Sequence, residues 1–525
     1  MTNWSRRRGR QVGLLDRELV RRSARIPPST LDPAMKLLTG AANHGMLWFA
    51  VAAALAVSKG RPRRAAIRGV LAIAGTSFTS NALAKPFLPR RRPAYEDVPA
   101  RRTIPNPPAS SSFPSGHSAS AAAFTTAVAL EAPLVGAVLA PVAAAVAYSR
   151  VHTGVHWPSD VVAGLVLGSG IALATRRWWP VRPEPAAAAR RCEDAAALPG
   201  GDGLVVLVNP GSGFETDDPA ADLAVALPAA RVLVADLDAD LAEQLEQAVL
   251  DHGAVALGVA GGDGTVACAA AVASRLQLPL AVVPTGTLNH FARDVGIEGL
   301  PDAARAVQAG SAVSVDLASV SVDGEPSTRF VNTASLGAYI VMVRRRERFR
   351  ETWGKWPAAA LGVVASMRHT VPLRVRIGGR SERVWMVFVG NGTYEPDGMA
   401  PGFRPRLDTG LLDVRYLRAD GPFSRTRFVL GVLTGALHRS RSYVQRRVPE
   451  LHLEVMGRPA TLATDGEIGE PGRRFHFRSD RATLLVYRPA TARLEPRQAS
   501  MSLPATPPGP RQASMSRFVG RVFGR

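Results

Sequence analysis

Alanine-rich apolar runs dominate the first third of the chain, and charged or proline-rich stretches separate them. Five such runs occur at residues 44–58, 66–84, 118–131, 133–148 and 161–175. Each is close to the lower length limit for crossing a bilayer, which takes about 20 apolar residues. The Arg-Arg-Trp-Trp sequence at 176–179 is typical of an anchor at the membrane interface. The pattern favours a small bundle of membrane helices, with a soluble alanine-rich bundle as the alternative.

The segment before these runs is basic and amphipathic. Residues 12–26 carry apolar side chains at helical spacing between arginines, and Pro27 and Pro28 follow. This pattern predicts a surface helix that ends at the two prolines. No apolar core lies close to the first residue, so no secretory signal peptide is expected.

A different pattern begins after residue 202. Short β-branched runs at 204–208, 255–260 and 280–283 lead into glycine-containing loops, and helical stretches separate them. Such an order predicts βα units around a parallel sheet. From about residue 315 the runs are shorter and turns are frequent, which indicates an antiparallel β-sandwich. Its strands are expected at 313–323, 371–377, 383–390, 411–417, 451–455 and 483–488.

These patterns divide the chain into an all-α membrane bundle, an α/β lobe and a β-sandwich lobe. Two regions of biased composition lie outside them: a Pro- and Ala-rich linker and a disordered basic tail in which Arg-Gln-Ala-Ser-Met-Ser occurs twice. The expected segments are 1–43 (amphipathic segment), 44–180 (bundle), 181–202 (linker), 203–315 (α/β lobe), 316–489 (sandwich lobe) and 490–525 (tail).

The charge of the chain is unevenly distributed. There are 64 lysines and arginines against 43 acidic residues, a formal net charge of +21, which by itself would indicate nucleic acid. Residues 1–191 carry +18 and residues 490–525 carry +5, whereas residues 192–489 carry −2. Because the largest part is near neutral, no nucleic-acid partner is expected, and the charge points to anionic lipid surfaces. The two cysteines exclude a disulfide scaffold and a cysteine-based zinc cluster.

Three short motifs in the first third together provide the groups of a phosphoester site. They are Lys85 with Arg92-Pro93, Pro-Ser-Gly-His at 114–117, and Ser149-Arg150 with His156 and Asp160. Lysine and arginine can neutralise phosphate oxygens, and a helix N-terminus favours an anion. A histidine oriented by a carboxylate can act as a nucleophile, and a second histidine can protonate the leaving oxygen. Each motif alone is weak, because a lone histidine near a helix end is usually structural.

These motifs resemble the type 2 phosphatidic acid phosphatase (PAP2) family, whose pattern is K-x6-RP, PSGH and SR-x5-H-x3-D. All three parts match, and the resemblance covers about residues 44–180. It implies cofactor-free dephosphorylation of a lipid phosphate through a phosphohistidine, with His156 as nucleophile, Asp160 as its orienting partner and His117 as general acid. The residues expected to hold the phosphate are Lys85, Arg92, Ser115, Gly116 and Arg150. Vanadate-binding haloperoxidases share the motifs, but the membrane-like helices argue against that alternative.

Three glycine-containing loops follow the predicted parallel strands. They are Gly-Gly-Asp-Gly-Thr at 261–265, Asn-Pro-Gly-Ser-Gly at 209–213 and Thr-Gly-Thr-Leu-Asn at 285–289. Nucleotides bind in α/β sheets at the carboxyl ends of such strands. Glycines let the backbone close on a phosphate, and an aspartate in such a loop can act through a metal ion. Ordinary strand–helix turns would explain the glycines but not the repeated Asp, Asn and Thr.

The Gly-Gly-Asp-Gly-Thr motif alone resembles the NAD kinases and the diacylglycerol kinases, and more distantly the phosphofructokinases. Further motifs match the soluble-type diacylglycerol kinase catalytic domain and its sphingosine and ceramide kinase relatives over about residues 203–489. These motifs are Asn-Pro-x-Ser-Gly from 209, Asn289 followed by Phe291-Ala292-Arg293, Asn332 with Ser335-Leu336-Gly337, Asn391-Gly392, Gly-Leu-Leu-Asp-Val at 410–414 and Asp-Gly-Glu at 465–467.

This resemblance implies phosphorylation of a diacylglycerol-like lipid with ATP and Mg²⁺. Asp465 would be the general base for the lipid hydroxyl, and Asp263 would hold Mg²⁺ through the nucleotide. The residues expected around ATP are Asn209, Gly261, Gly262, Asp263, Gly264, Thr265, Thr287, Asn289 and Glu467. His290 and Thr409 stand where the family often has aspartate. The second of these aspartates helps to bind a structural metal ion in some members, so that site is not carried over to Thr409.

Together, the two resemblances predict a bifunctional lipid enzyme in the cell membrane. It would be a multi-pass protein whose partners are membrane lipids and ATP, with the kinase in the cytoplasm, where ATP is found. Counting back through five spans places the phosphatase motifs on the opposite face. The alternatives are a membrane-anchored lipid-binding or regulatory protein with one inactive half, such as a pseudokinase, and a kinase that acts on a sphingoid-type lipid.

Overall fold

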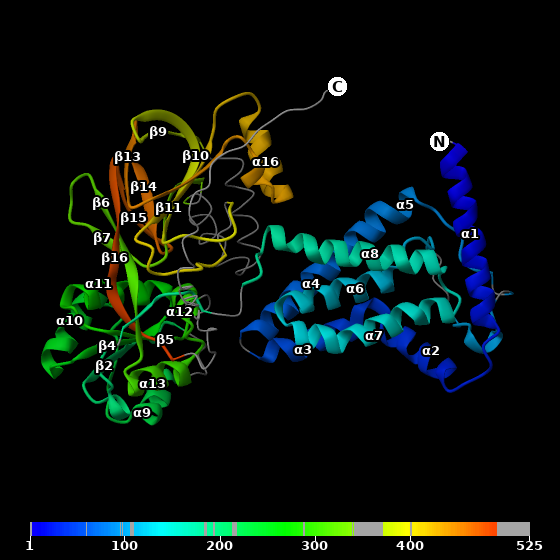
Figure 1. Ribbon diagram of the computed structural model, residues 1–525, viewed down its shortest axis with the longest axis horizontal. Coiled ribbons are helices and arrows are strands. Elements are labelled where there is room, and N and C mark those ends of the chain that lie inside the picture. Colours follow the sequence, from blue (N-terminus) through cyan, green and yellow to red (C-terminus); the bar gives the residue numbers. More distant parts are fainter. Residues whose placement is uncertain are drawn as a thin grey trace, which may run out of the picture. The chain divides into compact units, whose positions relative to one another are not determined.

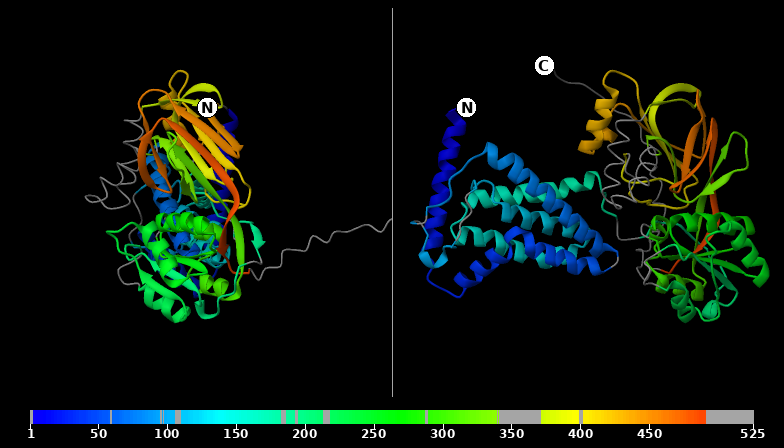
Figure 2. Two further views of the ribbon diagram at one scale, coloured as in Figure 1. Left: turned by 90° about the vertical axis from the view of Figure 1, so that its left-hand side faces the viewer. Right: turned by 180° about the vertical axis from the view of Figure 1, so that it is seen from behind.

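A computed structural model describes residues 3–58, 60–94, 96, 98–105, 110–182, 186–192, 195–212, 218–286, 289–338, 340, 371–398 and 402–490. Thr287, one of the residues expected around ATP, lies outside the described residues. So does the expected tail beyond residue 490. The described residues form a helical half up to residue 182 and a second half, of parallel and antiparallel sheet with helices, from residue 186 (Figures 1 and 2).

The helical half is built around α6. Its helices are α1 (Asn3–Ala24), α2 (Leu31–Ala41), α3 (Met46–Val57), α4 (Arg61–Phe78), α5 (Lys85–Phe87), α6 (Gly116–Glu131), α7 (Pro133–His152) and α8 (Pro158–Ala174). A π-helical segment, Thr79–Ala84, joins α4 to α5. Helices α4, α7 and α8 all pack against α6, most of whose side chains are buried (Figure 1). The five apolar runs of the sequence therefore fold as α3, α4, α6, α7 and α8.

Small residues let α6 and α8 approach each other closely. A Cβ atom at Gly164 would lie 2.5 Å from the carbonyl oxygen of Ser115, and one at Gly168 would meet the carbonyl oxygen of Ala119. Two small residues four apart are the pattern by which membrane helices bring their backbones together. The alanine- and glycine-rich composition of these runs is therefore a packing requirement at the centre of the bundle.

Two helices of the described part are long and apolar enough to cross a membrane. They are Pro133–His152 and Pro158–Arg177, the latter including a 3-10 turn after α8. The bent pair Leu31–Ala41 and Asn43–Val57 would make a third if it forms one span. Helices α3 and α6 have 12 and 16 residues, fewer than the roughly 20 that a span needs. The five expected spans therefore stay a prediction.

The N-terminal segment packs on the bundle. Helix α1 contacts α7 and α8, and α2 contacts α7. Asp32 of α2 is buried and accepts a hydrogen bond of 2.9 Å from Arg102 Nε, while its Oδ1 lies 2.8 Å from His152 Nε2. Leu14 and Leu15 of α1 remain exposed, in keeping with an amphipathic helix. The expected boundary at residue 43 is therefore not a structural one, because buried polar contacts cross it.

The α/β lobe has a parallel sheet in the order β3-β2-β4-β5, with helices on both faces (Figure 1). Its strands are β2 (Leu204–Val208), β3 (Arg231–Val234), β4 (Ala256–Gly261) and β5 (Leu280–Pro284). Its helices are α9 (Pro219–Ala226), α10 (Leu241–His252), α11 (Asp263–Leu276), α12 (His290–Val295) and α13 (Leu300–Ala309). All residues of β2 and β4 are buried, which is why these strands are continuous apolar runs.

The second lobe is an antiparallel β-sandwich with its own apolar core. Its strands are β6 (Ala312–Val322), β7 (Thr328–Phe330), β8 (Thr333–Gly337), β9 (Leu373–Ile377), β10 (Arg380–Asn391), β11 (Leu412–Arg418), β12 (Tyr443–Val448), β13 (Glu450–Val455), β14 (Ala460–Thr464), β15 (Glu467–Gly472) and β16 (Arg474–Tyr487), with α16 (Ser424–Thr434) beside them. The long strand β16 pairs with β6 and also, in parallel, with β5. The expected boundary at residues 315/316 therefore falls inside β6. The end of β16, the last strand of the chain, pairs with β5 of the α/β lobe.

The linker expected over 181–202 is wrong for its second part. Strand β1 (Arg190–Cys192) pairs with β6, and the Ala187 amide donates to the Asp294 carbonyl at 2.9 Å. Leu198 is buried against the α/β core. The segment from residue 186 therefore belongs to this lobe. Its composition is typical of a linker, but its small apolar residues pack against the lobe.

Candidate active sites

The helical half brings the residues of the three N-terminal motifs together at helix ends. Ser115, Gly116 and His117 lie at the start of α6, and Arg150 is near the end of α7. His156 lies between α7 and α8, and Asp160 is in the first turn of α8. Lys85 begins α5, and Arg92 follows that helix. Arg92 Nη1 is 3.3 Å from His156 Nε2. Burial, and after it the charge of Arg150, lowers the pKa of His117 to about 3. The motifs therefore form one cationic site.

His156 has the geometry of a neutral nucleophile. Its Nδ1 lies 2.7 Å from the carbonyl oxygen of Ser112, which assigns the ring proton to Nδ1 and leaves Nε2 unprotonated, with Arg92 Nη1 as its neighbour at 3.3 Å. Burial lowers the pKa of His156 to about 4. The imidazole is therefore uncharged near pH 7, as nucleophilic attack requires.

Ser112 stands between His156 and Asp160, and the sequence motifs did not single it out. The Ser112 hydroxyl donates to Asp160 Oδ2 at 2.5 Å and lies 3.4 Å from His156 Nδ1. The direct separation between His156 Nδ1 and Asp160 Oδ2 is 3.8 Å. The main-chain amide of Trp157 also donates to Asp160 Oδ2, at 2.9 Å. The carboxylate therefore orients the histidine largely through Ser112.

Arg90 and Asp16 extend this network to the N-terminal helix. Arg90 Nη1 donates to Asp160 Oδ1 at 2.6 Å, and its Nη2 donates to Asp16 Oδ2 at 2.7 Å. Asp16 is buried and also accepts the Ser159 amide at 2.9 Å and the Ser159 hydroxyl at 2.6 Å. One arginine thus connects a carboxylate of α1 to Asp160, the carboxylate next to His156.

Arg150 supplies unsatisfied donors at this site. Its side chain is 1% exposed, and its Nε and Nη1 have no hydrogen-bond partner among the described residues. Burying such donors without partners costs free energy. Phosphate oxygens are strong acceptors for guanidinium N–H groups. The site is therefore suited to an anion with several oxygens.

The other expected phosphate-site residues have protein partners. Lys85 Nζ donates to Asn81 Oδ1 at 2.9 Å, and His117 Nε2 lies 2.9 Å from Asn43 Oδ1. The Ser115 hydroxyl is buried 2.9 Å from Ser118 Oγ. Ser115 thus offers the start of α6 rather than a free hydroxyl. A Cβ at Gly116 would meet nothing within 4 Å, so this glycine leaves open space beside the helix end.

In the other half, glycines let two loops and a hairpin turn converge. A Cβ at Gly264 would lie 2.6 Å from Glu467 Oε1, and one at Gly286 would lie 2.5 Å from the Cα of Gly262. Gly261 ends β4, and Asp263 begins α11. A larger residue at Gly286 would push against the backbone of Gly262 and separate the two loops, whereas one at Gly264 would displace only the end of the flexible Glu467 side chain. Gly286 is therefore needed for the close approach of the two loops.

An asparagine in each of the other two loops, Asn209 and Asn289, holds its loop near the 261–265 loop. Asn209 Nδ2 donates to Thr265 Oγ1 at 2.8 Å. Asn289 has a left-handed backbone (φ 48), and its Nδ2 donates to the Gly286 carbonyl at 2.7 Å. Its Oδ1 is buried without a hydrogen-bond partner in the described part of the chain. The cradle thus has a free acceptor that a ligand donor would satisfy.

Asp465 lies in the two-residue turn between β14 and β15, where Asp-Gly is favoured because both positions need positive φ. Its φ is 47 and that of Gly466 is 95. The carboxylate accepts the amides of Val331, Asn332 and Thr333, each at 2.8 Å. Burial outweighs these hydrogen bonds and raises the pKa of Asp465 to about 6. The side chain is therefore held in place with a pKa suited to proton transfer.

Asn332 joins Asp263 and Asp465, and Arg404 holds Asn332. The Asn332 side chain lies 3.5 Å from Asp263 Oδ1, while its amide donates to Asp465. Arg404 is buried, and it donates to Asn332 Oδ1 at 3.2 Å and to Asp294 Oδ2 at 2.8 Å. Arg404 was not found from the sequence, because it lies in none of the motifs. The structure thus brings all the expected kinase residues that it describes to one place.

This chain combines two kinds of domain that act on phosphate groups of lipids. Residues 65–184 match the model of the PAP2 superfamily, and residues 203–320 match the model of the diacylglycerol kinase catalytic domain. The family assignments made from the motifs are therefore confirmed.

Three relatives illustrate the two similarities. A diacylglycerol kinase of Mycobacterium tuberculosis is 27% identical over 279 residues, which are 51% of this chain and 89% of that protein. The probable lipid kinase YegS-like of Pseudomonas aeruginosa is 31% identical over 260 residues, 48% of this chain and 82% of the relative. An undecaprenyl-diphosphatase of Sulfolobus acidocaldarius is 32% identical over 127 residues, 24% of this chain and 60% of the relative.

The chain belongs to the diacylglycerol kinase-type lipid kinases by its second half and carries a PAP2 phosphatase domain in its first. Its domains are those of a lipid phosphatase and a lipid kinase, and the kinase domain implies ATP with a divalent metal ion.

Proposed function

We propose that the protein is a bifunctional membrane enzyme that removes phosphate from a lipid phosphate and transfers phosphate from ATP to a diacylglycerol-like lipid. The phosphatase would occupy about residues 44–180, together with helices α1 and α2, which pack on the bundle. The kinase would occupy about residues 186–489. A lipid alcohol is the product of the first reaction and the acceptor in the second.

In the phosphatase half, His156 Nε2 attacks the phosphorus, and the bond from phosphorus to the lipid oxygen breaks. His117 gives its proton to that oxygen. The oxygen of a water molecule then attacks the phosphorus, the bond from phosphorus to Nε2 breaks, and the water gives a proton to His117. Inorganic phosphate is released, and both imidazoles return to their starting state. Arg150, Lys85, Arg92 and the start of α6 hold the phosphate oxygens. The buried Nε and Nη1 of Arg150, which have no hydrogen-bond partner in the described part of the chain, are the observation that best supports this proposal.

The test of the phosphatase is phosphate release by detergent-purified protein from phosphatidate, a phosphatidylglycerol phosphate and a polyprenyl pyrophosphate, with EDTA present. We expect release from at least one substrate, and its loss in His156→Ala. His252→Ala, an exposed histidine of α10, is the matched control. Release by His156→Ala at the wild-type rate would refute the assignment, and complete inhibition by EDTA would refute metal independence.

In the kinase half, the lipid hydroxyl oxygen attacks the γ-phosphorus of ATP, the bond to the β-phosphate oxygen breaks, and Asp465 takes the hydroxyl proton. The glycine loops, Asn209, Thr265 and Asn289 cradle the nucleotide. Asp263 would bind Mg²⁺ through the nucleotide, since a carboxylate beside a phosphate cradle suits this ion. Bound Mg²⁺ offsets charge on the transferring phosphoryl group. The link through Asn332 is the observation that best supports this proposal.

The test of the kinase is transfer of label from ATP to diacylglycerol and, in a parallel assay, to a sphingoid base. We expect transfer to diacylglycerol, and its loss in Asp263→Ala with the phosphatase rate unchanged. Absence of transfer by wild-type protein to either lipid would favour the alternative of a pseudokinase with a regulatory role. Transfer to the sphingoid base alone would favour the other alternative.

The proposed location is the cell membrane, with several spans, the kinase in the cytoplasm and the phosphatase motifs on the opposite face. Cysteine labelling in intact cells tests it in a background without Cys192 and Cys268. Ala100→Cys lies two residues after Val98, which lies against Gly154 in the loop that carries His156, and Ser58→Cys lies between α3 and α4. Both positions are exposed. We expect an impermeant reagent to label position 100 and not position 58. The reverse result would overturn this topology.

A further inference from the structure

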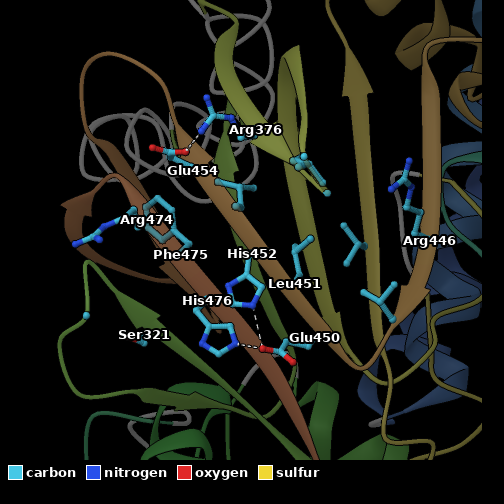
Figure 3. A pocket seen from close by; sticks show the side chains of 17 residues that line it. Ser321, Arg376, Arg446, Glu450, Leu451, His452, Glu454, Arg474, Phe475 and His476 are labelled. Atoms are coloured by element: carbon cyan, nitrogen blue, oxygen red, sulfur yellow. Dashed lines mark hydrogen bonds and ion pairs between the residues drawn. The ribbon is translucent and has the colours of Figure 1, made fainter.

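A pair of histidines lies on the sandwich lobe, in none of the motifs described above. His452 of β13 and His476 of β16 are directly opposite each other in antiparallel register. Their rings are parallel, with centroids 4.2 Å apart and an interplanar angle of 9°. Figure 3 shows both rings on the same side of the two strands. The sheet itself therefore fixes two imidazoles side by side.

A carboxylate completes the group. Glu450 is two residues before His452 on β13, so both side chains point to the same face. Glu450 Oε1 lies 3.0 Å from His452 Nε2 and 2.5 Å from His476 Nε2 (Figure 3). Each ring thus points its Nε2, the ring nitrogen farther from the backbone, toward the same Glu450 oxygen. The three ligand atoms lie within 4.8 Å of one another.

Three neighbouring arginines are paired with other carboxylates. Arg376 lies 2.8 Å from Glu454, Arg474 lies 3.9 Å from Asp323, and Arg478, directly opposite Glu450 in the register, lies 2.8 Å from Asp480. Among the described side chains, the two histidines are the groups that contact the Glu450 carboxylate. Its charge is therefore available to a cation held between the imidazoles.

We propose that Glu450, His452 and His476 form a binding site for a zinc-like divalent transition-metal ion. Two imidazole nitrogens and one carboxylate oxygen are a ligand set that such ions prefer, whereas Mg²⁺ prefers oxygen ligands and keeps its waters. A site with three protein ligands leaves a coordination position for water. His452 is 74% exposed and His476 is 42% exposed, so water can occupy that position.

The ion would fasten β13 to β16 next to a surface cavity of about 760 Å³. Strand β16 is the strand that returns to the α/β lobe, so the metal would stabilise the strand that joins the two lobes of the kinase. The site uses none of the residues assigned above to phosphate or ATP. It is therefore separate from the Mg²⁺ that the kinase reaction uses.

The test is zinc binding by full-length protein without a histidine tag, first stripped with chelator. Titration calorimetry with Zn²⁺ measures the stoichiometry, and Co²⁺ absorption reports the ligand environment. We expect the His452→Ala/His476→Ala double variant to bind one ion fewer than wild type. We expect Glu450→Gln to weaken this site by more than about 100-fold, since losing even an outer-shell partner costs about 10- to 100-fold.

His252→Ala, which removes an exposed histidine of the other kinase lobe, should leave the stoichiometry unchanged. Retained kinase activity shows that each variant is folded. The proposal is overturned if wild-type protein binds no Zn²⁺. It is also overturned if the double variant binds as many ions as wild type, because the ions would then occupy other sites.

Discussion

At the residue scale, Asp465 combines two opposing influences on one carboxyl group. Three backbone amides stabilise its ionised form, while burial disfavours it and raises its pKa to about 6. The three amides fix the orientation of the carboxylate, and burial makes it more basic. A group that must take a proton from a lipid hydroxyl near neutral pH needs both.

The kinase rate should therefore rise with pH through about 6 and then level off. Below the pKa of Asp465 the protonated carboxyl cannot accept a proton, so the rate should fall about tenfold per pH unit. Initial rates of lipid phosphorylation between about pH 4.5 and 8 measure this rising part of the pH–rate profile. Asp465→Asn should lose activity across the range. The exposed Asp420→Asn is the control, and a rise near pH 6 that persists in Asp465→Asn would contradict the role of this carboxyl.

Most of the catalytic residues proposed here could be found from the sequence because their spacing is fixed by local structure. The Asp-Gly turn at 465–466 and the Gly-Gly-Asp-Gly-Thr loop after β4 are examples. Ser112 and Arg404 could not be found this way. Their partners lie far away in the chain, 48 residues for Ser112 and Asp160, and 110 for Arg404 and Asp294. Neither residue belongs to a motif with local spacing.

At the element scale, helix α1 is connected to His156, the proposed phosphatase nucleophile, through Asp16, Arg90 and Asp160. Asp16→Asn keeps the shape of the side chain and removes its charge, so Arg90 loses one of its two carboxylates. We expect the phosphatase kcat to fall about 10- to 100-fold, because small displacements of a catalytic group have such effects. KM should change less. Phosphate release under saturating substrate measures this.

Glu18→Gln on the same helix is the control, since Glu18 pairs only with Arg22 on the exposed surface in the described contacts. The kinase rate of each variant serves as an internal check of folding. Wild-type kcat in Asp16→Asn would show that α1 has no positioning role.

The close contact of α6 with α8 gives a second prediction for this half. Gly168→Val places a side chain against the Ala119 carbonyl, whereas Gly170→Val, on the same helix, meets nothing within 4 Å. Both variants have the same intrinsic helix preference, so their difference isolates packing. We expect Gly168→Val to cost about 1–3 kcal/mol or more by overpacking. Thermal unfolding in detergent should show a lower Tm for Gly168→Val alone; equal Tm values would contradict the close approach of α8 to α6.

Element types were predictable where a run had one clear period, and boundaries were not. The buried strands β2 and β4 are continuous apolar runs, and α7 follows its predicted run closely. The segment from residue 186 has the composition of a linker and yet forms β1 against β6. Strand β16 ends in the α/β lobe beside β5, although all the other strands of the sandwich lie between them in the chain. Such long-range pairing leaves no periodic trace in the sequence.

At the scale of the whole molecule, the two proposed reactions form a cycle. The phosphatase turns a lipid phosphate into a lipid alcohol, and the kinase returns a phosphate from ATP to such an alcohol. If one lipid serves both halves, unlabelled phosphatidate should become labelled from γ-labelled ATP. In mixed detergent micelles, where both sites reach the same lipid, wild-type protein should incorporate label with only phosphatidate supplied.

Two variants separate the steps of this cycle. His156→Ala should incorporate label from added diacylglycerol but not from phosphatidate, because it cannot produce the alcohol. Asp263→Ala should release phosphate from phosphatidate and incorporate no label from either lipid. If wild-type protein labels diacylglycerol and dephosphorylates phosphatidate, yet never labels phosphatidate supplied alone, product does not pass from one half to the other under these conditions. The fusion of the two domains would then serve two separate lipids, each with its own reaction.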